Sequence, residues 1–402
     1  MTTSERLPHT VYLAVTAFFF TSLASSILMP FLPLYLCNVR HIPLKTAGLA
    51  FLVMGIGQLV ISPIAGKLND SFSPKTILFC SPAVRAVFLF ALAWAVYAQY
   101  SFSVMLVLLF FASAAGGSTA ISIDSYLART IPHYQLNRAH SRLSMAMNIG
   151  WIIGPIGGAY LARTPFSLIF SLTAICCLFS AAMTFFFCPK PKKNIANNNH
   201  RSHPWHDSFN LVLKNRTYLW FLIGVFLIIG AYYQLFSNFS IYVTETLKIS
   251  KNMLGTLYVI NAVMIVALQL PADWLCKTIS IKNKIILGIS FFVAGSIGFA
   301  LTEQLWQLII ALIFFTTGEM LTIPTIRSLV PKFSPKHATG SYIGIYGLAY
   351  SLGSSLGPYG GSLLYGSNLS CKVWLLWGSM AVSLLLGLVI FMCIPYKSTS
   401  IE

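Results

Sequence analysis

Long apolar runs recur through the whole chain and constrain its fold more than any other feature. A helix needs about 20 apolar residues to cross the hydrocarbon core of a bilayer. Twelve runs of about that length predict spans at residues 11–37, 46–66, 77–97, 102–124, 143–162, 166–188, 217–243, 252–275, 284–302, 306–328, 340–365 and 372–395. Only 9% of the residues are charged and 56% are hydrophobic, whereas soluble domains contain about 25% charged residues. We therefore expect an all-α membrane protein with twelve transmembrane helices.

A glycine-proline pattern, G-x-x-x-G-P-x-G-G, occurs once in each half of the chain, at residues 150–158 and 353–361. The two copies lie 203 positions apart, about half of the 402 residues, which indicates two related six-helix bundles around a pseudo-twofold axis. Glycines four apart let another helix approach closely, and a proline kinks a membrane helix. A paired, moving interface is expected, with static packing as the alternative. The residues of this hypothesis are Gly150, Gly154, Pro155, Gly158, Gly353, Gly357, Pro358 and Gly361.

Two aspartates repeat with the same spacing. Asp70 follows the second run and Asp273 ends the eighth, again 203 positions apart. A carboxylate at this place can stabilise the start of a neighbouring helix and hold cytoplasmic helix ends together. The alternative is an ordinary acid at the membrane interface.

The middle of the chain is polar and divides it into three parts: an N-terminal bundle at 1–188, a cytoplasmic linker at 189–215 and a C-terminal bundle at 216–402. A stretch so poor in apolar residues is expected to be a mobile linker. Its histidines, His200, His203 and His206, are spaced as metal ligands can be, but nothing fixes their geometry, so no metal site is predicted.

Basic residues give the orientation. Nineteen of the 26 Lys and Arg residues fall on the side of the two termini and six on the other side, while Arg85 lies within a span. Cytoplasmic loops carry the excess of positive charge, so both termini are expected in the cytoplasm. The net charge of +17 is spread between apolar runs, so we expect no nucleic-acid partner. No nucleotide loop, metal site or nucleophile–base pair is visible, so neither a cofactor nor an enzymatic activity is expected.

Three segments resemble motifs of a known family. The first run contains Leu23-Ala24, five residues and Pro30-Phe31-Leu32-Pro33, similar to L-G-x5-P-V-x-P. Residues 66–75 are similar to G-x-L-A-D-R-x-G-R-K and keep Gly66, Leu68, Asp70 and Lys75. Ser71, Ser73 and Pro74 replace its Arg, Gly and Arg. The third segment is Gly150-x3-Gly154-Pro155, where one residue, not two, precedes the glycine pair, so that only Gly158 is in register.

These motifs and the span count resemble the major facilitator superfamily, and more narrowly its twelve-helix drug:proton antiporters. The family's motif in span 4, with an arginine followed by Gln-Gly, is not recognisable in this chain. The resemblance implies two six-helix bundles that rock around a central cavity, a bacterial cytoplasmic membrane location, and a single chain sufficient for transport. The glycine-proline motif in span 5 implies export.

Charged side chains at membrane depth are costly and often mark transport pathways. Of the nine acids, Glu319 lies inside the tenth span, and Asp124 lies at the inner end of the fourth. Arg85 lies about two turns into the third span. Desolvation disfavours the charged form of a carboxyl group, which suits a group that must bind and release a proton. We hypothesise that Glu319 is the leading proton carrier and Asp124 the second, with Arg85 as a further coupling candidate.

Simpler interpretations stay open for these groups. Glu319 can be a neutral acid hydrogen-bonded to a neighbouring helix. Asp124 can form an ion pair with Arg85 or with Arg129. A glutamine at position 319 that left proton-driven transport intact would remove Glu319 from the scheme.

A substrate path is expected between the two bundles, near the bilayer midplane. Polar and aromatic residues on its helices are the candidates, and Tyr232-Tyr233-Gln234 interrupts the seventh span. An aromatic, weakly charged cavity suits amphiphilic organic molecules. The candidate residues are Tyr232, Tyr233, Gln234, Asn238 and Thr317.

Three functions remain open. The first is a proton-driven exporter of amphiphilic small molecules, such as drugs or a siderophore-like metabolite. The second is a proton-coupled importer of a metabolite. The third is a membrane receptor or assembly partner that transports nothing. The expected partners are a small-molecule substrate, protons and the lipid bilayer, with the protein acting as a monomer.

Overall fold

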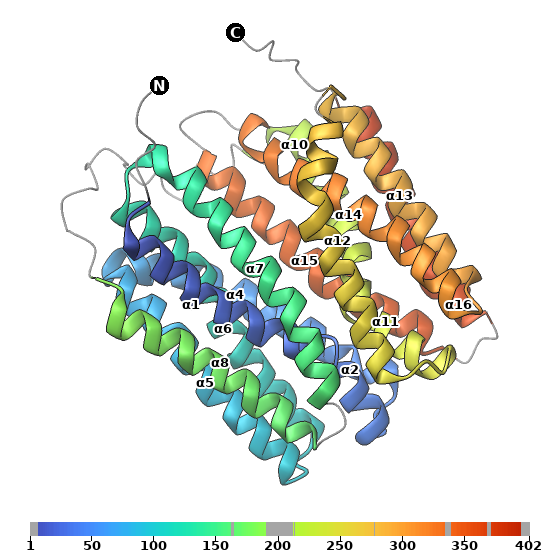
Figure 1. Ribbon diagram of the computed structural model, residues 1–402, viewed down its shortest axis with the longest axis horizontal. Coiled ribbons are helices and arrows are strands. Elements are labelled where there is room, and N and C mark those ends of the chain that lie inside the picture. Colours follow the sequence, from blue (N-terminus) through green and yellow to red (C-terminus); the bar gives the residue numbers. More distant parts are fainter. Residues whose placement is uncertain are drawn as a thin grey trace. The chain divides into compact units, whose positions relative to one another are not determined.

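The computed structural model describes residues 7–161, 165–189, 212, 214–276, 278–333, 339–367 and 371–394. Within these ranges the chain is helical and contains no strand (Figure 1), so the predicted all-α class is confirmed. In the first half the elements are α1 (His9–Leu28), α2 (Leu32–Leu34), the π-helix η1 (Tyr35–Val39), α3 (Leu44–Ala47), α4 (Leu49–Ser71), α5 (Pro74–Tyr97), α6 (Phe102–Thr130), α7 (His133–Leu161) and α8 (Phe166–Phe187).

The second half repeats this plan. Its elements are α10 (Arg216–Tyr232), the 3-10 helix η2 (Tyr233–Phe236), α11 (Asn238–Ile241), the π-helix η3 (Tyr242–Thr246), α12 (Lys251–Leu275), α13 (Ile281–Leu301), α14 (Leu305–Phe333), α15 (Thr339–Tyr365) and α16 (Lys372–Cys393). In the described part, ten helical segments are long and apolar enough to cross a membrane. The two long helices outside this group, α7 and α15, carry the glycine-proline patterns. His, Arg, Asn and Gln residues lower the apolar content of α7, and Gly, Ser and Tyr residues lower that of α15.

Several helices extend beyond the apolar runs that predict them. The run at 143–162 becomes α7, which begins ten residues earlier at His133, and the run at 306–328 becomes α14, which continues to Phe333. The run at 46–66 is divided into α3 and α4 by a turn at Gly48. Backbone hydrogen bonding continues a helix into water after the apolar residues end, so hydropathy alone underestimates these lengths.

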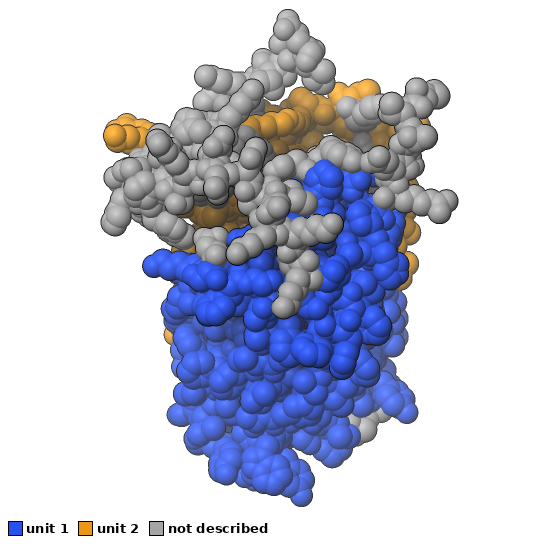
Figure 2. Space-filling view, turned by 90° about the vertical axis from the view of Figure 1, so that its left-hand side faces the viewer, with its two compact units in different colours: residues 1–41, 49–200, 251–262 blue, residues 42–48, 201–250, 263–402 orange. Residues whose placement is uncertain are grey.

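The described residues form two compact units (Figure 2). Unit 1 takes those in the ranges 1–41, 49–200 and 251–262, and unit 2 those in 42–48, 201–250 and 263–402. Residues 42–48 therefore pack with unit 2 and residues 251–262 with unit 1. The predicted linker at 189–215 stays a prediction, because residues 190–211 and 213, including all three histidines, lie outside the described part.

Within each unit the helices have matching neighbours. In unit 1, α1 packs against α7 and α8, and α5 against α6 and α8. In unit 2, α10 packs against α15 and α16, and α13 against α14 and α16. These four pairs correspond between the units, as two copies of one six-helix plan would give, whereas the close α4–α6 pair of unit 1 has no equally close counterpart between α12 and α14 in the described part.

The ends of α1 and α10 also repeat in detail. Each continues through a π-helix, η1 or η3, and reaches a non-glycine residue with positive φ, His41 at 53° and Lys248 at 56°. π-Helices are rare, and L-residues seldom adopt positive φ. Equivalent irregularities 207 positions apart are therefore further evidence of duplication.

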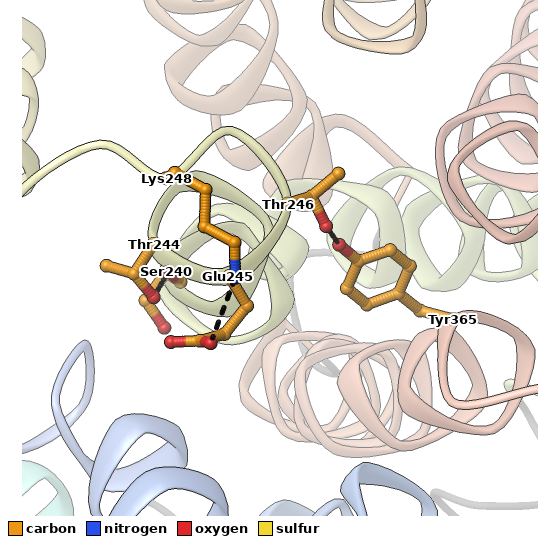
Figure 3. Close-up of polar contacts among 6 residues, drawn as sticks. All are labelled: Ser240, Thr244, Glu245, Thr246, Lys248 and Tyr365. Atoms are coloured by element: carbon orange, nitrogen blue, oxygen red, sulfur yellow. Dashed lines mark hydrogen bonds and ion pairs between the residues drawn. The ribbon is translucent and has the colours of Figure 1, made fainter.

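Polar contacts hold the segment that contains η3 (Figure 3). The Thr246 and Tyr365 hydroxyls share a hydrogen bond, which joins this segment to the end of α15. The Thr244 hydroxyl donates to the Ser240 carbonyl at 2.9 Å, and Lys248 lies 3.9 Å from Glu245. The last pair is largely exposed and contributes little stability.

A lysine caps the same helix end in both units. Lys75, in the first turn of α5, donates to the Phe185 carbonyl at 3.0 Å, and Lys282, in the first turn of α13, donates to the Met392 carbonyl at 2.6 Å. Carbonyls at a helix C-terminus lack intrahelical donors and carry partial negative charge. The matched motif residue Lys75 therefore has a structural contact, as does a lysine that no motif marks.

We expect Lys75→Met and Lys282→Met each to lower the free energy of unfolding by about 0.3–1 kcal/mol, the usual contribution of a cation at a helix C-terminus. Thermal unfolding of the purified protein in detergent measures this loss. The control is Lys67→Met, because the Lys67 side chain is exposed and makes no hydrogen bond or ion pair with the described residues. Equal shifts in all three variants would show that the caps contribute nothing specific.

Candidate functional site

The helix formed by α10, η2 and α11 is broken in its middle. α10 ends at Tyr232, the chain tightens into a 3-10 turn, and Ser237 leaves helical geometry with φ −130° and ψ −87° before α11 begins. Irregular backbone at membrane depth is tolerated only where protein or a water-filled cavity satisfies its polar groups. The break falls on the polar interruption of the seventh apolar run, and it positions the side chains from Tyr232 to Asn238.

A buried carboxyl group lies against this break. Glu319 is the fifteenth residue of the 29-residue helix α14, so it lies near the middle of the span. Glu319 is 9% exposed, and the Tyr232 hydroxyl donates a hydrogen bond to Glu319 Oε1 at 2.8 Å. A neutral hydroxyl can donate to the carboxyl group in either protonation state. This bond therefore positions the group without adding an opposite charge.

Tyrosines surround this carboxyl group on unit 2. The Tyr233 and Tyr350 hydroxyls lie 3.3 Å apart, and their ring centroids are 6.0 Å apart. Tyr232 packs on Tyr233 with centroids 5.3 Å apart, and Tyr346 lies 6.1 Å from Tyr350. Tyr232, Tyr233 and Tyr350 remain partly exposed. They form an aromatic surface with hydroxyl groups and one buried acid, which we call the tyrosine cluster (Tyr232, Tyr233, Tyr346 and Tyr350).

Tyr346 and Tyr350 were not predicted from the sequence. A signal was present, because Tyr342, Tyr346 and Tyr350 recur every four residues and so share one face of α15. The Tyr342 side chain is buried and packs on Tyr218 with ring centroids 4.5 Å apart, and its backbone carbonyl accepts a hydrogen bond from the Tyr218 hydroxyl at 2.6 Å. The other two tyrosines continue this face toward Tyr233.

The two amides of the break bind the glycine-proline pattern of α15. Gln234 Nε2 donates to the Gly357 carbonyl at 2.7 Å, and Asn238 Nδ2 donates to the Pro358 carbonyl at 3.0 Å. Asn238 also donates to Gln234 Oε1 at 2.6 Å. Both side chains are buried, so their amides connect two helices of unit 2 instead of facing an open surface. Thr317 uses its hydroxyl to donate to the Ile313 carbonyl of its own helix at 2.8 Å.

Three of the four glycines in each pattern contact another segment of the same unit. In unit 1, Cβ atoms at Gly150 and Gly154 would reach α1, and the Ser26 hydroxyl donates to the Gly150 carbonyl at 2.8 Å. A Cβ at Gly158 would lie 2.7 Å from Phe31 Cδ2. In unit 2, Gly353 and Gly357 contact α10 in the same way, and Gly361 lies against the Gln234 amide. Each pattern thus places α7 on α1 or α15 on α10.

The motif at residues 66–75 is only partly described. A Cβ added at Gly66 would meet no other described atom within 4 Å, so packing does not require a glycine there. The side chains of Asp70 and Asp273 lie outside the described part. The paired role expected for these aspartates therefore stays a prediction.

Arg85 and Asp124 lie in unit 1 and do not form an ion pair. The Arg85 residue is 7% exposed, and its Nη2 donates to Ser25 Oγ at 3.0 Å. Asp124 lies at the inner end of α6, where His140 Nδ1 is 3.6 Å from its carboxylate. The suggested Arg85–Asp124 pair was wrong, because Asp124 lies eight residues beyond Gly116, which faces the guanidinium, and eight residues are about 12 Å of helix. The pairing with Arg129 stays open.

Burial of the Arg85 guanidinium within the membrane has a high free-energy cost. An arginine near the centre of a transmembrane helix costs about 2.5–3.5 kcal/mol on membrane-insertion scales.

In the part of the chain that the structure describes, no group of three or more His, Cys, Asp or Glu side chains is placed to hold a metal ion. The notable buried polar groups are the Glu319 carboxyl group beside its tyrosines in unit 2 and the Arg85 guanidinium beside Ser25 in unit 1.

Comparisons with known proteins agree on one family. The family model of the Major Facilitator Superfamily matches residues 14–358. Multidrug resistance protein MdtH of Yersinia enterocolitica is 24% identical over 363 residues, which cover 85% of each chain. The multi-drug resistance efflux pump PmrA homolog of Lactococcus lactis is 26% identical over 362 residues, covering 87% of this chain and 86% of its own. The crystal structure of nucleoside transporter NupG has a TM-score of 0.76 at 16% identity, covering 97% of this chain and 100% of its own.

Proposed function

This chain belongs to the major facilitator superfamily, and from that premise we propose that it is a proton-coupled antiporter that exports amphiphilic small organic molecules. The family and the matched relatives are transporters and not enzymes, and the chain is a multi-pass membrane protein with a small-molecule substrate. We place it in the bacterial cytoplasmic membrane with both termini in the cytoplasm, acting as a monomer.

The observation that carries the proposal is the hydrogen bond from Tyr232 to the buried carboxyl group of Glu319. Burial disfavours a charged carboxylate, so movement of this group between a wet and a dry environment changes its proton occupancy. In our scheme Glu319 takes a proton from the outer side and releases it to the cytoplasm. Release of the proton accompanies cargo binding on the inner side, so that proton entry drives cargo exit.

The tyrosine cluster supports the amphiphilic class of cargo. Partly exposed phenol rings offer apolar faces for a hydrophobic ligand and hydroxyls for its polar groups. Several rings in edge-to-face contact form a broad surface, which suits varied molecules better than one closely fitted ligand. Relatives named for multidrug resistance are consistent with a broad cargo range. A secreted siderophore-like metabolite is a second amphiphilic cargo of the proposal.

Transport in proteoliposomes under an imposed pH gradient tests the proposal. We expect the protein to move an amphiphilic dye, such as ethidium, or an iron chelator against its gradient and toward the more acidic side, with proton flow in the opposite direction. A protonophore should abolish this accumulation. Movement of cargo and protons in the same direction would indicate the importer. The absence of flux with every dye and chelator of a panel would favour the non-transporting receptor.

A further inference from the structure

Arg85 lies in the middle of its span and inside unit 1. It is eleven residues from the start of α5, about 16 Å along a helix of about 36 Å. A guanidinium at this depth cannot reach either membrane surface by extending its side chain, so its charge must be satisfied where it lies. An intramembrane ionisable group that the fold does not neutralise indicates a functional site.

The described residues accept hydrogen bonds from few of the N–H donors of the Arg85 guanidinium. A guanidinium has five N–H donors. Ser25 Oγ accepts one of them, and Arg85 Nε has no hydrogen-bond partner among the described residues. No described carboxylate forms an ion pair with it, since Asp124 lies eight residues beyond Gly116, about 12 Å farther along α6. Hydrogen bonds to the described residues therefore do not saturate the guanidinium, although its Nε–H is itself buried.

The neighbouring helix packs closely on this group. Gly116 of α6 faces the guanidinium, and a Cβ there would lie 3.2 Å from Arg85 Cζ and from Nη1. Gly116 and Ser25 are each partly exposed, although Arg85 is buried. The guanidinium thus lies against α1 and α6, and the partly exposed Ser25 and Gly116 are the neighbours past which a ligand can reach it.

We propose that Arg85 binds a carboxylate group of the transported molecule, with Ser25 as a second polar contact once its hydroxyl turns from the Thr21 carbonyl, to which it donates at 3.3 Å, toward the ligand. Two parallel N–H donors of a guanidinium match the two oxygens of a carboxylate, and a charge-assisted pair of this kind is strong away from water. The cargo is then an organic acid or a zwitterion with a hydrophobic body. This inference rests on the proposed transport function and narrows its substrate class.

A matched pair of dyes tests the inference. Rhodamine 110 carries a free carboxylate, and rhodamine 123 is its methyl ester, so the two differ only in the proposed contact group. We expect the purified full-length protein to bind rhodamine 110 at least about tenfold more tightly in fluorescence anisotropy, a ratio equal to about 1.4 kcal/mol. Arg85→Gln should remove this preference, while rhodamine 123 still binds. Arg85→Lys should retain part of it, because the charge remains and the paired donors do not.

Two adjacent glycines supply a control that keeps the arginine. Gly116→Ala crowds the guanidinium and should reduce the preference for the acid. Gly117→Ala makes an equally tight contact, 3.2 Å, with Ile61 Cγ2 instead, and should leave the preference intact. Retained binding of rhodamine 123 shows that each variant is folded. Equal changes for the two dyes, or no change in Arg85→Gln, would overturn the proposal.

The outcomes separate this inference from the proposed function. Proton-driven transport of rhodamine 123 without any preference for the acid refutes the carboxylate site and leaves the exporter in place. A preference for the acid that depends on Arg85, without proton coupling, supports the site and refutes the antiporter. If rhodamine 123 binds and rhodamine 110 does not, Arg85 takes no carboxylate and the proposal fails. Failure to bind either dye counts against both.

Discussion

Glu319→Gln is expected to reduce proton-driven accumulation of cargo to the level of protein-free liposomes. Glutamine has nearly the same size as glutamate, and its carbonyl oxygen can still accept the hydrogen bond that Tyr232 donates at 2.8 Å. It cannot bind or release a proton, so the pH gradient no longer biases the transport cycle. Exchange of labelled for unlabelled cargo without a gradient should persist, because the binding surface is retained.

The chain provides a matched control for this change. Glu303 is an exposed acid just before α14, and Glu303→Gln removes the same charge outside the helix. Its transport should equal that of the unmodified protein at every pH gradient. Tyr232→Phe, which keeps the ring and removes the donor, should give an intermediate rate. Full gradient-driven accumulation by Glu319→Gln would exclude this residue as the proton carrier.

The general architecture could be predicted because a membrane limits the choices. Apolar length and the repeated glycine-proline pattern predict twelve helices in two related sets, and the helix class and family are confirmed. The interruption at Tyr232-Tyr233-Gln234 also marked where the helix breaks. These features depend on local sequence, which a single chain shows directly.

Other features depend on which helices meet. Nothing in the sequence indicates that residues 42–48 pack with α15, where a Cβ at Gly48 would lie 2.8 Å from Ser362 Cβ. The sequence also does not indicate that Arg85 donates to Ser25 and does not pair with Asp124. Both partners are polar, and they differ only in how far along their helices they lie. Tyr350 joins the site because Gln234 and Gly357 set the register of α10 and α15.

Gly357→Ala is expected to destabilise unit 2 more than alanine at any other glycine of its glycine-proline pattern. A Cβ at this position would lie 2.7 Å from the carbonyl carbon of Gly230, which is backbone and cannot rotate away. α15 would have to move off α10, and the hydrogen bond from Gln234 to the Gly357 carbonyl would lengthen. Overpacking usually costs about 1–3 kcal/mol, and the lost bond adds to this. Thermal unfolding and the fraction of monodisperse protein in detergent measure the effect.

Neighbouring glycines separate close packing from helix propensity. No described atom lies within 4 Å of a Cβ added at Gly360 or Gly157, so alanine there should stabilise the helix by about 0.5–1 kcal/mol. Gly154→Ala should destabilise unit 1, since its Cβ would lie 2.7 Å from Ser26 Cβ. Ser26→Gly should partly rescue Gly154→Ala, because it removes that side chain. No such rescue exists for Gly357, where Gly230 is already without a side chain. Equal effects at positions 357 and 360 would show that close helix contact is not why the pattern contains glycine.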